Sequence, residues 1–296
     1  MGRALCAGMA ATLAIALLVQ GDVASAAVRQ GIGICLTSVV PSLFPFLVTS
    51  SLLVSLGAGQ WAQRRMGGLF RRLFRCGGAG AAALVLGIVG GYPTGGRTVA
   101  ALVQQGALTV QEGERALAFC NNAGIAFTVG IAGRTVLGSS RLGGWLLVVH
   151  VAAALLTGWL LRPKGTVPPA PPVKRPPLSP AVFPDAVQGA AAAMGRLCGF
   201  VVFFTVVLAL LEHTAGALPA GMAGFLELTC GILRLTRDRQ GFTLAAALLS
   251  WGGLSVHGQT AAVTAHTGMR LRPYLTGKAV QSALSAAMAH LLWPLL

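Results

Sequence analysis

The sequence predicts an all-α polytopic membrane protein with two inverted repeats, re-entrant hairpins and discontinuous helices. Composition is the first reason: 55% of the 296 residues are hydrophobic and only 10% are charged, against about 25% charged residues in an average soluble domain. Uncharged runs, such as residues 30–63 and 142–161, are the second reason, because about 20 mainly apolar residues cross a bilayer as a helix. The third reason is a series of polar, glycine-bearing interruptions in those runs.

The N-terminal segment, residues 1–28, has two interpretations. Arg3 precedes an apolar run, and the stretch "VASAAV" then contains the small residues Ala24 and Ala26. This pattern is typical of a secretory signal peptide with an A-x-A cleavage site. It also fits an N-terminal transmembrane helix that is not removed, and we favour this second interpretation.

The net charge of +15, from 22 basic and 7 acidic residues, bears on the partners of the protein. Nucleic-acid binding and basic cytoplasmic loops facing anionic lipid both produce such a balance. In a chain this apolar the second explanation is favoured, so we expect membrane lipids and no nucleic acid as partners. The six cysteines show no C-x-x-C spacing, and we expect no metal site, no disulfide framework and no cofactor.

A proline-rich linker at residues 162–185 divides the chain into comparable halves. Its stretch "RPKGTVPPAPPVKRPPLSPAVFP" holds nine of the fifteen prolines, and so much proline favours an extended solvated segment over a helix. The halves, residues 29–161 and 186–296, share an order of elements. Each has a long apolar helix, a shorter glycine-bearing stretch, an interrupted apolar element and a final apolar helix. This order predicts an internal repeat, although few residues are identical.

The basic segments predict the topology. The stretch "RRMGGLFRRLFR" combines arginines and apolar residues at helical spacing, which is typical of a helix in the cytoplasmic interface. With this helix and the linker inside, a re-entrant hairpin near residues 80–105 enters from the cytoplasm, and a second near 218–233 enters from outside. Inverted repeats with discontinuous helices characterise secondary transporters. Arg234, Arg237 and Arg239 would then lie outside, against the positive-inside rule.

The stretch "LGIVGGYPTGGRTVAALV", residues 86–103, nearly matches a phosphate-binding loop. Gly91 and Gly96 have the spacing of that motif, but Arg97 stands in the place of its lysine. No aspartate ends an apolar strand, where such a loop needs a ligand for Mg²⁺. Nucleotide hydrolysis is therefore disfavoured.

In a membrane the same stretch predicts a broken helix. Pro93 removes a backbone donor, and the neighbouring glycines relax helical geometry. A broken backbone at membrane depth is tolerated where it is buried in protein or lines a watery cavity. The helix that restarts near Thr94 and Gly95 would direct its free N–H groups at such a cavity, with Arg97 on its first turn. The alternative is that Arg97 is a surface residue that extends to the interface.

A second interruption, "FCNNAG" at residues 119–124, places two amide side chains within an apolar span. Asn121 and Asn122 are costly there unless they find partners, and Gly124 offers a further break. One asparagine alone often links two helices, a contact worth about 1 kcal/mol. Two adjacent ones point to different faces, so we favour a binding role.

A third interruption, "WGGLSVHGQT" at residues 251–260, alternates polar residues among glycines. Ser255, His257 and Gln259 have the pattern of an unwound segment that faces a cavity. His257 is a candidate substrate or proton partner, since an ionisable group in a membrane is by default a functional hypothesis. Glu227 is a second candidate for proton coupling, and a structural salt bridge to Arg196 is the alternative.

Five strings carry a resemblance to a known family: "PSLFPFLV", "GGYPTGGR", "EGERALAFCNNAG", "LELTCG" and "SWGGLSVHGQ". Together they resemble the YlbJ-like sporulation integral membrane proteins, also called SpoVV, of the nucleoside-recognition or Gate domain family. The resemblance runs from about Val28 to Pro294. The chain departs from the family pattern at residues 95–97, where it reads Gly-Gly-Arg, and at 121–125, where it reads Asn-Asn-Ala-Gly-Ile.

The resemblance implies a multi-pass transporter that moves dipicolinate during sporulation, in the bacterial cell membrane or the outer forespore membrane. A planar dianion suits a cavity with helix N-termini, an arginine and amide donors. The expected substrate-binding residues are Thr94, Gly95, Arg97, Asn121, Asn122, Ser255, His257 and Gln259.

Two other classes of function remain open. The group name favours a carrier of nucleosides or other neutral solutes, and a non-transporting scaffold for spore assembly is the other. An enzyme is not expected, because the chain has no H-E-x-x-H, no paired aspartates and no G-x-S-x-G. The sequence leaves open whether the chain forms a homo-oligomer.

Overall fold

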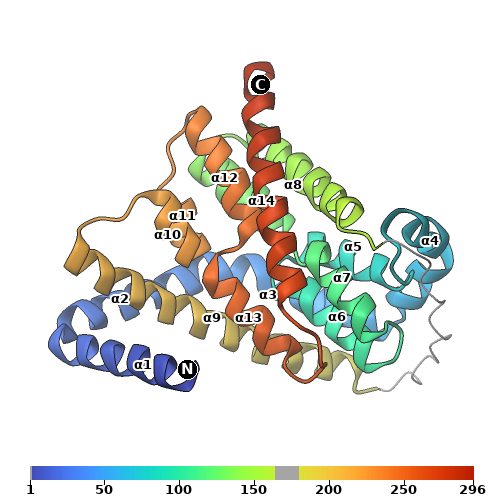
Figure 1. Ribbon diagram of the computed structural model, residues 1–296, viewed down its shortest axis with the longest axis horizontal. Coiled ribbons are helices and arrows are strands. Elements are labelled where there is room, and N and C mark those ends of the chain that lie inside the picture. The colour runs from blue at the N-terminus through green and yellow to red at the C-terminus, as the bar shows by residue number, and fades with distance from the viewer. Residues whose placement is uncertain (1, 164–179) are drawn as a thin grey trace.

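The structure is a computed structural model that describes residues 2–163 and 180–296, and the regular elements in these ranges are all helices (Figure 1). The predicted all-helical fold class is confirmed for this part of the chain. Most of the predicted linker at 162–185 lies outside the described residues. In chain order the elements are α1 (Gly2–Val19), α2 (Gly21–Ile34), η1 (Cys35–Val39), α3 (Val40–Ser55), α4 (Ala58–Phe74), α5 (Gly80–Gly90), α6 (Thr94–Gln104), α7 (Val110–Cys120), η2 (Ala126–Val136), α8 (Ser140–Leu160), α9 (Val182–Ala215), α10 (Ala220–Leu226), α11 (Leu228–Ile232), α12 (Arg239–Trp251), α13 (Gly253–Thr264), α14 (Arg272–Leu292) and η3 (Trp293–Leu295).

Three helices in the described ranges are long and apolar enough to cross a membrane: Gly21–Leu53, Ser140–Leu160 and Val182–Ala215. The first comprises α2, η1 and most of α3, which follow one another without a gap. Its π-helical turn η1 ends just before Pro41, and Pro45 lies inside α3. Because proline removes a backbone donor, a local π turn is one way in which a membrane helix accommodates it.

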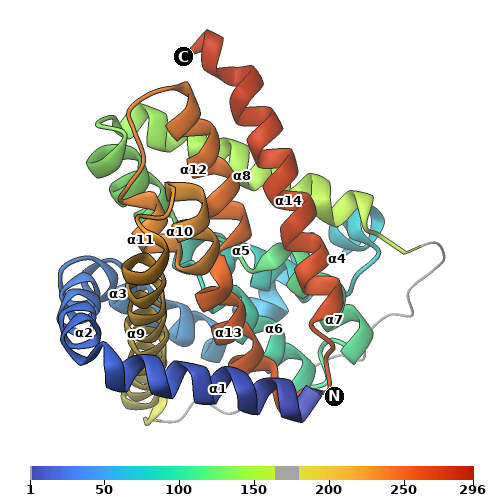
Figure 2. The same cartoon turned by 60° about the vertical axis from the view of Figure 1, so that its left-hand side comes forward.

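With α1 and α4 set aside, the described helices of the two halves follow the same order. The first half has the long run α2–α3, the short pair α5–α6, the interrupted pair α7–η2 and the final helix α8. The second has α9, α10–α11, α12–α13 and α14 in the same order. Corresponding elements also pack together, since α2 and α3 lie along α9, and α8 lies along α14 (Figures 1 and 2).

The N-terminal segment is not one helix to residue 28. The chain leaves helical geometry at Gln20, with φ −115° and ψ 43°, so that α1 ends at Val19 and α2 begins at Gly21. Leu13 and Ala16 of α1 pack against a small apolar cluster of α2 and α9. Figure 2 shows α1 lying across one edge of the molecule.

Capping residues explain where several helices begin. Thr109 and Glu112 form a capping box at the start of α7, in which the Thr109 side chain accepts from the Glu112 N–H and the Glu112 carboxylate accepts from the Thr109 N–H. Ser139 caps α8, and Asp238 caps α12 by accepting a hydrogen bond from the Gly241 N–H at 2.7 Å. Each cap satisfies a donor that the first turn of a helix leaves free.

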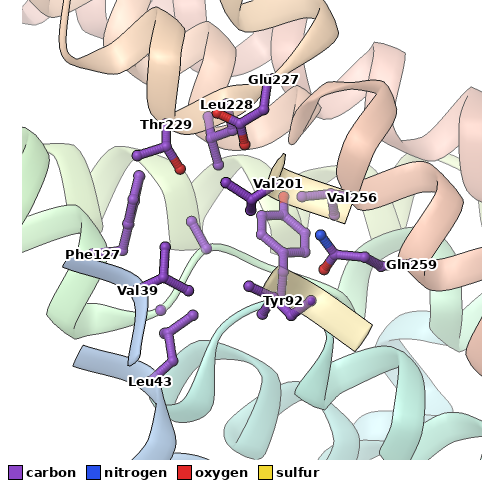
Figure 3. Close-up of a pocket in the computed structure, with 13 residues that line it drawn as sticks. Val39, Leu43, Tyr92, Phe127, Val201, Glu227, Leu228, Thr229, Val256 and Gln259 are labelled. Carbon is purple, nitrogen blue, oxygen red and sulfur yellow. The ribbon is translucent and has the colours of Figure 1, made fainter. Parts of the chain in front are cut away.

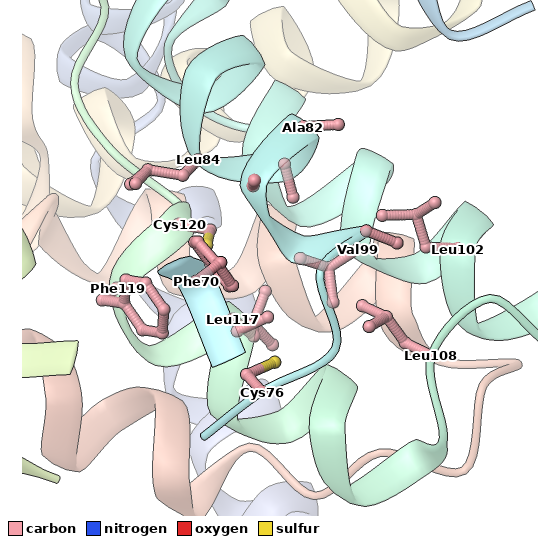
Figure 4. Close-up of a cluster of buried hydrophobic side chains, with 14 of the residues drawn as sticks. Phe70, Cys76, Ala82, Leu84, Val99, Leu102, Leu108, Leu117, Phe119 and Cys120 are labelled. Atoms are coloured by element: carbon pink, nitrogen blue, oxygen red, sulfur yellow. The ribbon is translucent and has the colours of Figure 1, made fainter. Parts of the chain in front are cut away.

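The amphipathic segment near residue 70 contributes to a buried cluster rather than lying wholly on the surface. Phe70 and Phe74 of α4 pack on Phe119 of α7, with ring centroids 5.8 and 4.8 Å away (Figure 4). Other apolar side chains of α4, including Trp61 and Leu69, are exposed. The cluster holds α4, α5, α6 and α7 together next to the second interruption.

Candidate functional site

The three interruptions meet in the middle of the molecule. The turn Gly91–Pro93 joins α5 to α6, and Gly91 packs directly on Gly124 in the gap between α7 and η2. The Tyr92 hydroxyl donates to the Leu249 carbonyl at 3.0 Å, near the end of α12. α12 and α13 are separated by Gly252, whose φ of +91° is the left-handed conformation that favours glycine. Segments that are far apart in the sequence thus share one region.

Glycines permit the closest approach between these segments. A Cβ atom at Gly87 or at Gly95 would overlap the carbonyl oxygen of Cys120, where α7 ends. The short pair α5–α6 can therefore enclose the end of α7 only if both positions lack a side chain. Gly95, a predicted binding residue, has this packing role in the structure.

Replacing Gly95 by alanine is expected to lower the free energy of unfolding by about 1–3 kcal/mol, as overpacking of a filled interior does. The matched control is Gly195→Ala, because a Cβ at Gly195 of α9 has no heavy atom within 4 Å. Thermal unfolding in detergent measures both. Equal melting temperatures for the two variants would contradict the packing role.

A small cavity lies at the meeting point of the interruptions. Its volume is about 50 Å³, enough for one or two water molecules. The two π-helical segments contribute Val39 and Phe127, and the polar groups come from Glu227, Thr229 and Gln259 (Figure 3). Two of the predicted residues, Glu227 and Gln259, line this central cavity.

A second cavity, of about 190 Å³, contains another part of the predicted set. Thr94 and Arg97 line it from the first turn of α6. Its other polar lining is hydroxyls, from Ser50, Ser51, Ser55 and Thr98.

The two cavities follow one face of α3. Leu43 lines the central cavity and Leu47, one helical turn further on, lines the cavity at Arg97. The Arg97 guanidinium has no hydrogen bond or ion pair to any residue that the structure describes, and the Thr94 hydroxyl is buried without a partner. This second cavity therefore holds polar groups that are free to bind.

The amides of Asn121 and Asn122 are fully buried and already bonded to protein groups. Asn121 accepts from the Gly96 N–H at 3.1 Å and donates to the Thr260 hydroxyl at 2.9 Å. Asn122 donates to the Phe119 carbonyl at 2.8 Å and accepts from the Gln281 amide at 3.0 Å. In this conformation the two asparagines stabilise the break between α7 and η2, and they line neither cavity.

Ser255 and His257 lie on α13, and Ser255 bonds Glu227, which lines the central cavity. Glu227 links α10 to α11 and accepts from the Cys230 N–H at 2.8 Å, and the Ser255 hydroxyl donates to its other oxygen at 3.4 Å. His257 contacts the Tyr274 hydroxyl at 3.0 Å, while its Nε2 is buried without a partner. The Gln259 Oε1 is likewise buried and unpaired. Unpaired buried polar atoms are uncommon, so these two are candidates for water or a ligand.

Lys278 on α14 is fully buried, and the sequence patterns described above did not single it out. Its Nζ donates to the Asn121 carbonyl and to the Gln281 Oε1, both at 2.7 Å, and lies 5.4 Å from the centroid of the Tyr92 ring. A signal for it does exist in the sequence: Lys278, Gln281 and Ser285 are spaced i, i+3 and i+7, which places them on one face of a helix.

A hydrogen-bonded chain connects this face of α14 to α8 of the first half and to α12. The Ala123 N–H donates to His150 Nε2 at 3.2 Å, so Nδ1 carries the proton and donates to the Ser250 hydroxyl at 3.0 Å. Ser250 bonds the Ser285 hydroxyl at 2.6 Å. His150 on α8 thus orders the break after α7 instead of facing lipid.

The fold and this interior define an integral membrane protein. Large apolar side chains are exposed along the long helices, as at Val148, Leu155, Phe203 and Leu211, and exposed apolar surface on this scale suits lipid. The chain is similar to the sporulation integral membrane protein YlbJ of Bacillus subtilis (strain 168). The two are 25% identical over 313 aligned positions, which cover 90% of this chain and 76% of YlbJ. This similarity agrees with the resemblance to YlbJ-like proteins that the sequence strings carry. No protein-family model matches the chain, and no solved structure matches it.

Proposed function

We propose that this protein is a secondary-type transporter of a small organic anion, most simply dipicolinate, which it moves across the outer forespore membrane during sporulation. The observation that carries the proposal is the meeting of three backbone interruptions around adjoining cavities. Secondary transporters bind substrate where discontinuous helices meet near the bilayer midplane. The similarity to a sporulation integral membrane protein supports a role in a membrane during sporulation.

In this proposal the two halves are inverted repeats of a Gate domain. The short pairs α5–α6 and α10–α11 are re-entrant hairpins, and α7–η2 and α12–α13 are the discontinuous helices. The shared order of elements and the packing of α8 on α14 support this arrangement. Alternating access to the two sides of the membrane then results from movement of one repeat against the other, without ATP hydrolysis or any other catalysed reaction.

The charge of the substrate follows from the cavity at Arg97. An anion is favoured by a guanidinium that has no partner in the described part of the chain, by several hydroxyls and by the N-terminus of α6. A cavity of about 150 Å³ accommodates benzene, so the 190 Å³ cavity suits a small aromatic acid. The central cavity, at about 50 Å³, is closed to such a molecule in this conformation. Transport requires the leucines of α3 and the Tyr92 turn to separate.

Uptake into liposomes tests the proposal. The purified full chain should take up labelled pyridine-2,6-dicarboxylate, and unlabelled dicarboxylate should compete while nucleosides should not. Competition by nucleosides would favour the neutral-solute carrier instead. If correctly inserted protein moved neither dicarboxylates nor nucleosides, the non-transporting scaffold for spore assembly would be favoured. Its partner would then be lipids rather than a small anion.

A further inference from the structure

Lys278 places an ionisable amine in the interior, and no carboxylate among the described residues forms an ion pair with it. The ion pairs among the described residues are Arg234–Glu212 and Arg270–Glu114, and neither involves α14 at this depth. Both hydrogen-bond partners of Lys278 are uncharged oxygens. A charge in a membrane interior is costly, and such residues mark ion or substrate pathways.

The surroundings of Lys278 have the chemistry of a cation site at a helix break. One partner is the carbonyl of Asn121, the C-cap residue directly after α7, where the helix dipole is negative. Unwound carbonyls and the C-terminal ends of half-helices coordinate the coupling cation in transporters with broken helices. In this chain an ammonium occupies that position.

The geometry also connects Lys278 to the substrate path. Tyr92 presents its ring to Lys278 and lines the central cavity as well. Gly277 allows the approach of α14 to α7, because a Cβ there would lie 2.5 Å from the Ala118 carbonyl oxygen. A change in the Tyr92 turn therefore changes what the ammonium faces.

We propose that Lys278 is the coupling group of the transporter, so that one proton travels with each anion and Na⁺ is not required. This inference rests on the proposed function. An anion in the central cavity stabilises the ammonium, whereas an empty cavity stabilises the neutral amine. In the return step Nζ gives its proton to water admitted at the break, and it takes up a proton from water on the other side before the next anion enters.

The other titratable groups near Lys278 come from every helix around it. Cys120 lies at the end of α7, His150 on α8 and His257 on α13. Tyr92 faces it from the turn between α5 and α6, and Tyr274 lies one helical turn before it on α14. On α12, Ser250 bonds His150 and the Ser285 hydroxyl of α14. None of these groups supplies a permanent negative charge at neutral pH.

The test compares net uptake with exchange in Na⁺-free liposomes. The probes are pyridine-2,6-dicarboxylate and a trapped pH-sensitive dye, and the variants are Lys278→Met, Lys278→Arg and the control Arg64→Met. One proton moving with a dianion carries a net charge of −1, so the membrane potential is clamped at zero, and each unit of imposed pH gradient then gives about tenfold accumulation. Both Lys278 variants should lose accumulation and dye response while still exchanging labelled for unlabelled dicarboxylate, because neither side chain releases a proton.

The control should behave as wild type, since Arg64 is exposed on α4. Two results would overturn the coupling role of Lys278 and leave the proposed function standing. One is wild-type accumulation that does not depend on the pH gradient, and the other is a Lys278→Met variant that still accumulates dicarboxylate. A wild type without gradient dependence overturns the proposal even if neither variant folds. A wild type that moves no dicarboxylate under any gradient overturns the proposed function as well.

Discussion

Replacing Arg97 by alanine should reduce dicarboxylate uptake by about tenfold or more. A hydrogen bond to a charged group contributes about 1.5–3 kcal/mol, and about 1.4 kcal/mol corresponds to a factor of ten. Arg97 lines the hydroxyl-rich cavity, and no residue within 2–163 and 180–296 would lose a bond to its guanidinium on replacement. Stability should therefore change little while uptake falls.

Two further variants sharpen this prediction. Arg97→Lys retains the charge but not the planar fork that binds a carboxylate with two hydrogen bonds, so intermediate uptake is expected. Arg64→Ala removes an exposed arginine of α4 and should leave uptake unchanged. Initial rates in liposomes measure all three. Wild-type rates for Arg97→Ala would mean that the anion does not pass this cavity.

The positions of the interruptions could be predicted because their chemistry is local. Pro93 lacks a donor, and Gly252 adopts a conformation that other residues rarely reach. The order of helices followed from the apolar runs for the same reason. The break at Gln20 was not predicted, because no proline marks it and the apolar run continues on both sides of Gln20-Gly21-Asp22.

The partners of the polar residues could not be predicted, since they depend on the tertiary packing. Two adjacent asparagines suggested free binding groups, yet each amide is used by protein partners in this conformation. The sequence does not reveal the partner of Lys278, and only the fold shows that it meets the Asn121 carbonyl. Sequence spacing reveals the face on which a residue lies, but not what lies opposite.

The bonds of Asn121 lead to the second large effect. Asn121→Ala should strongly destabilise the protein and abolish uptake, because the buried Gly96 N–H loses its acceptor and the Thr260 hydroxyl loses a partner. Each buried polar group left unpaired costs about 1–3 kcal/mol. The loss concerns the segment that positions both Arg97 on α6 and the carbonyl that binds Lys278.

Gln111→Ala is the matched control, since it removes an exposed amide from the same helix, α7. Thermal unfolding in detergent should show a large decrease in melting temperature for Asn121→Ala and almost none for Gln111→Ala. Asn121→Asp should fall between them, because a carboxylate still accepts from the Gly96 N–H but cannot donate to Thr260. If Asn121→Ala had the same melting temperature as the control and still transported dicarboxylate, the break after α7 would not depend on this amide. The stability of the interrupted helix would then have to come from the glycine contacts at Gly95 and the bonds of Lys278.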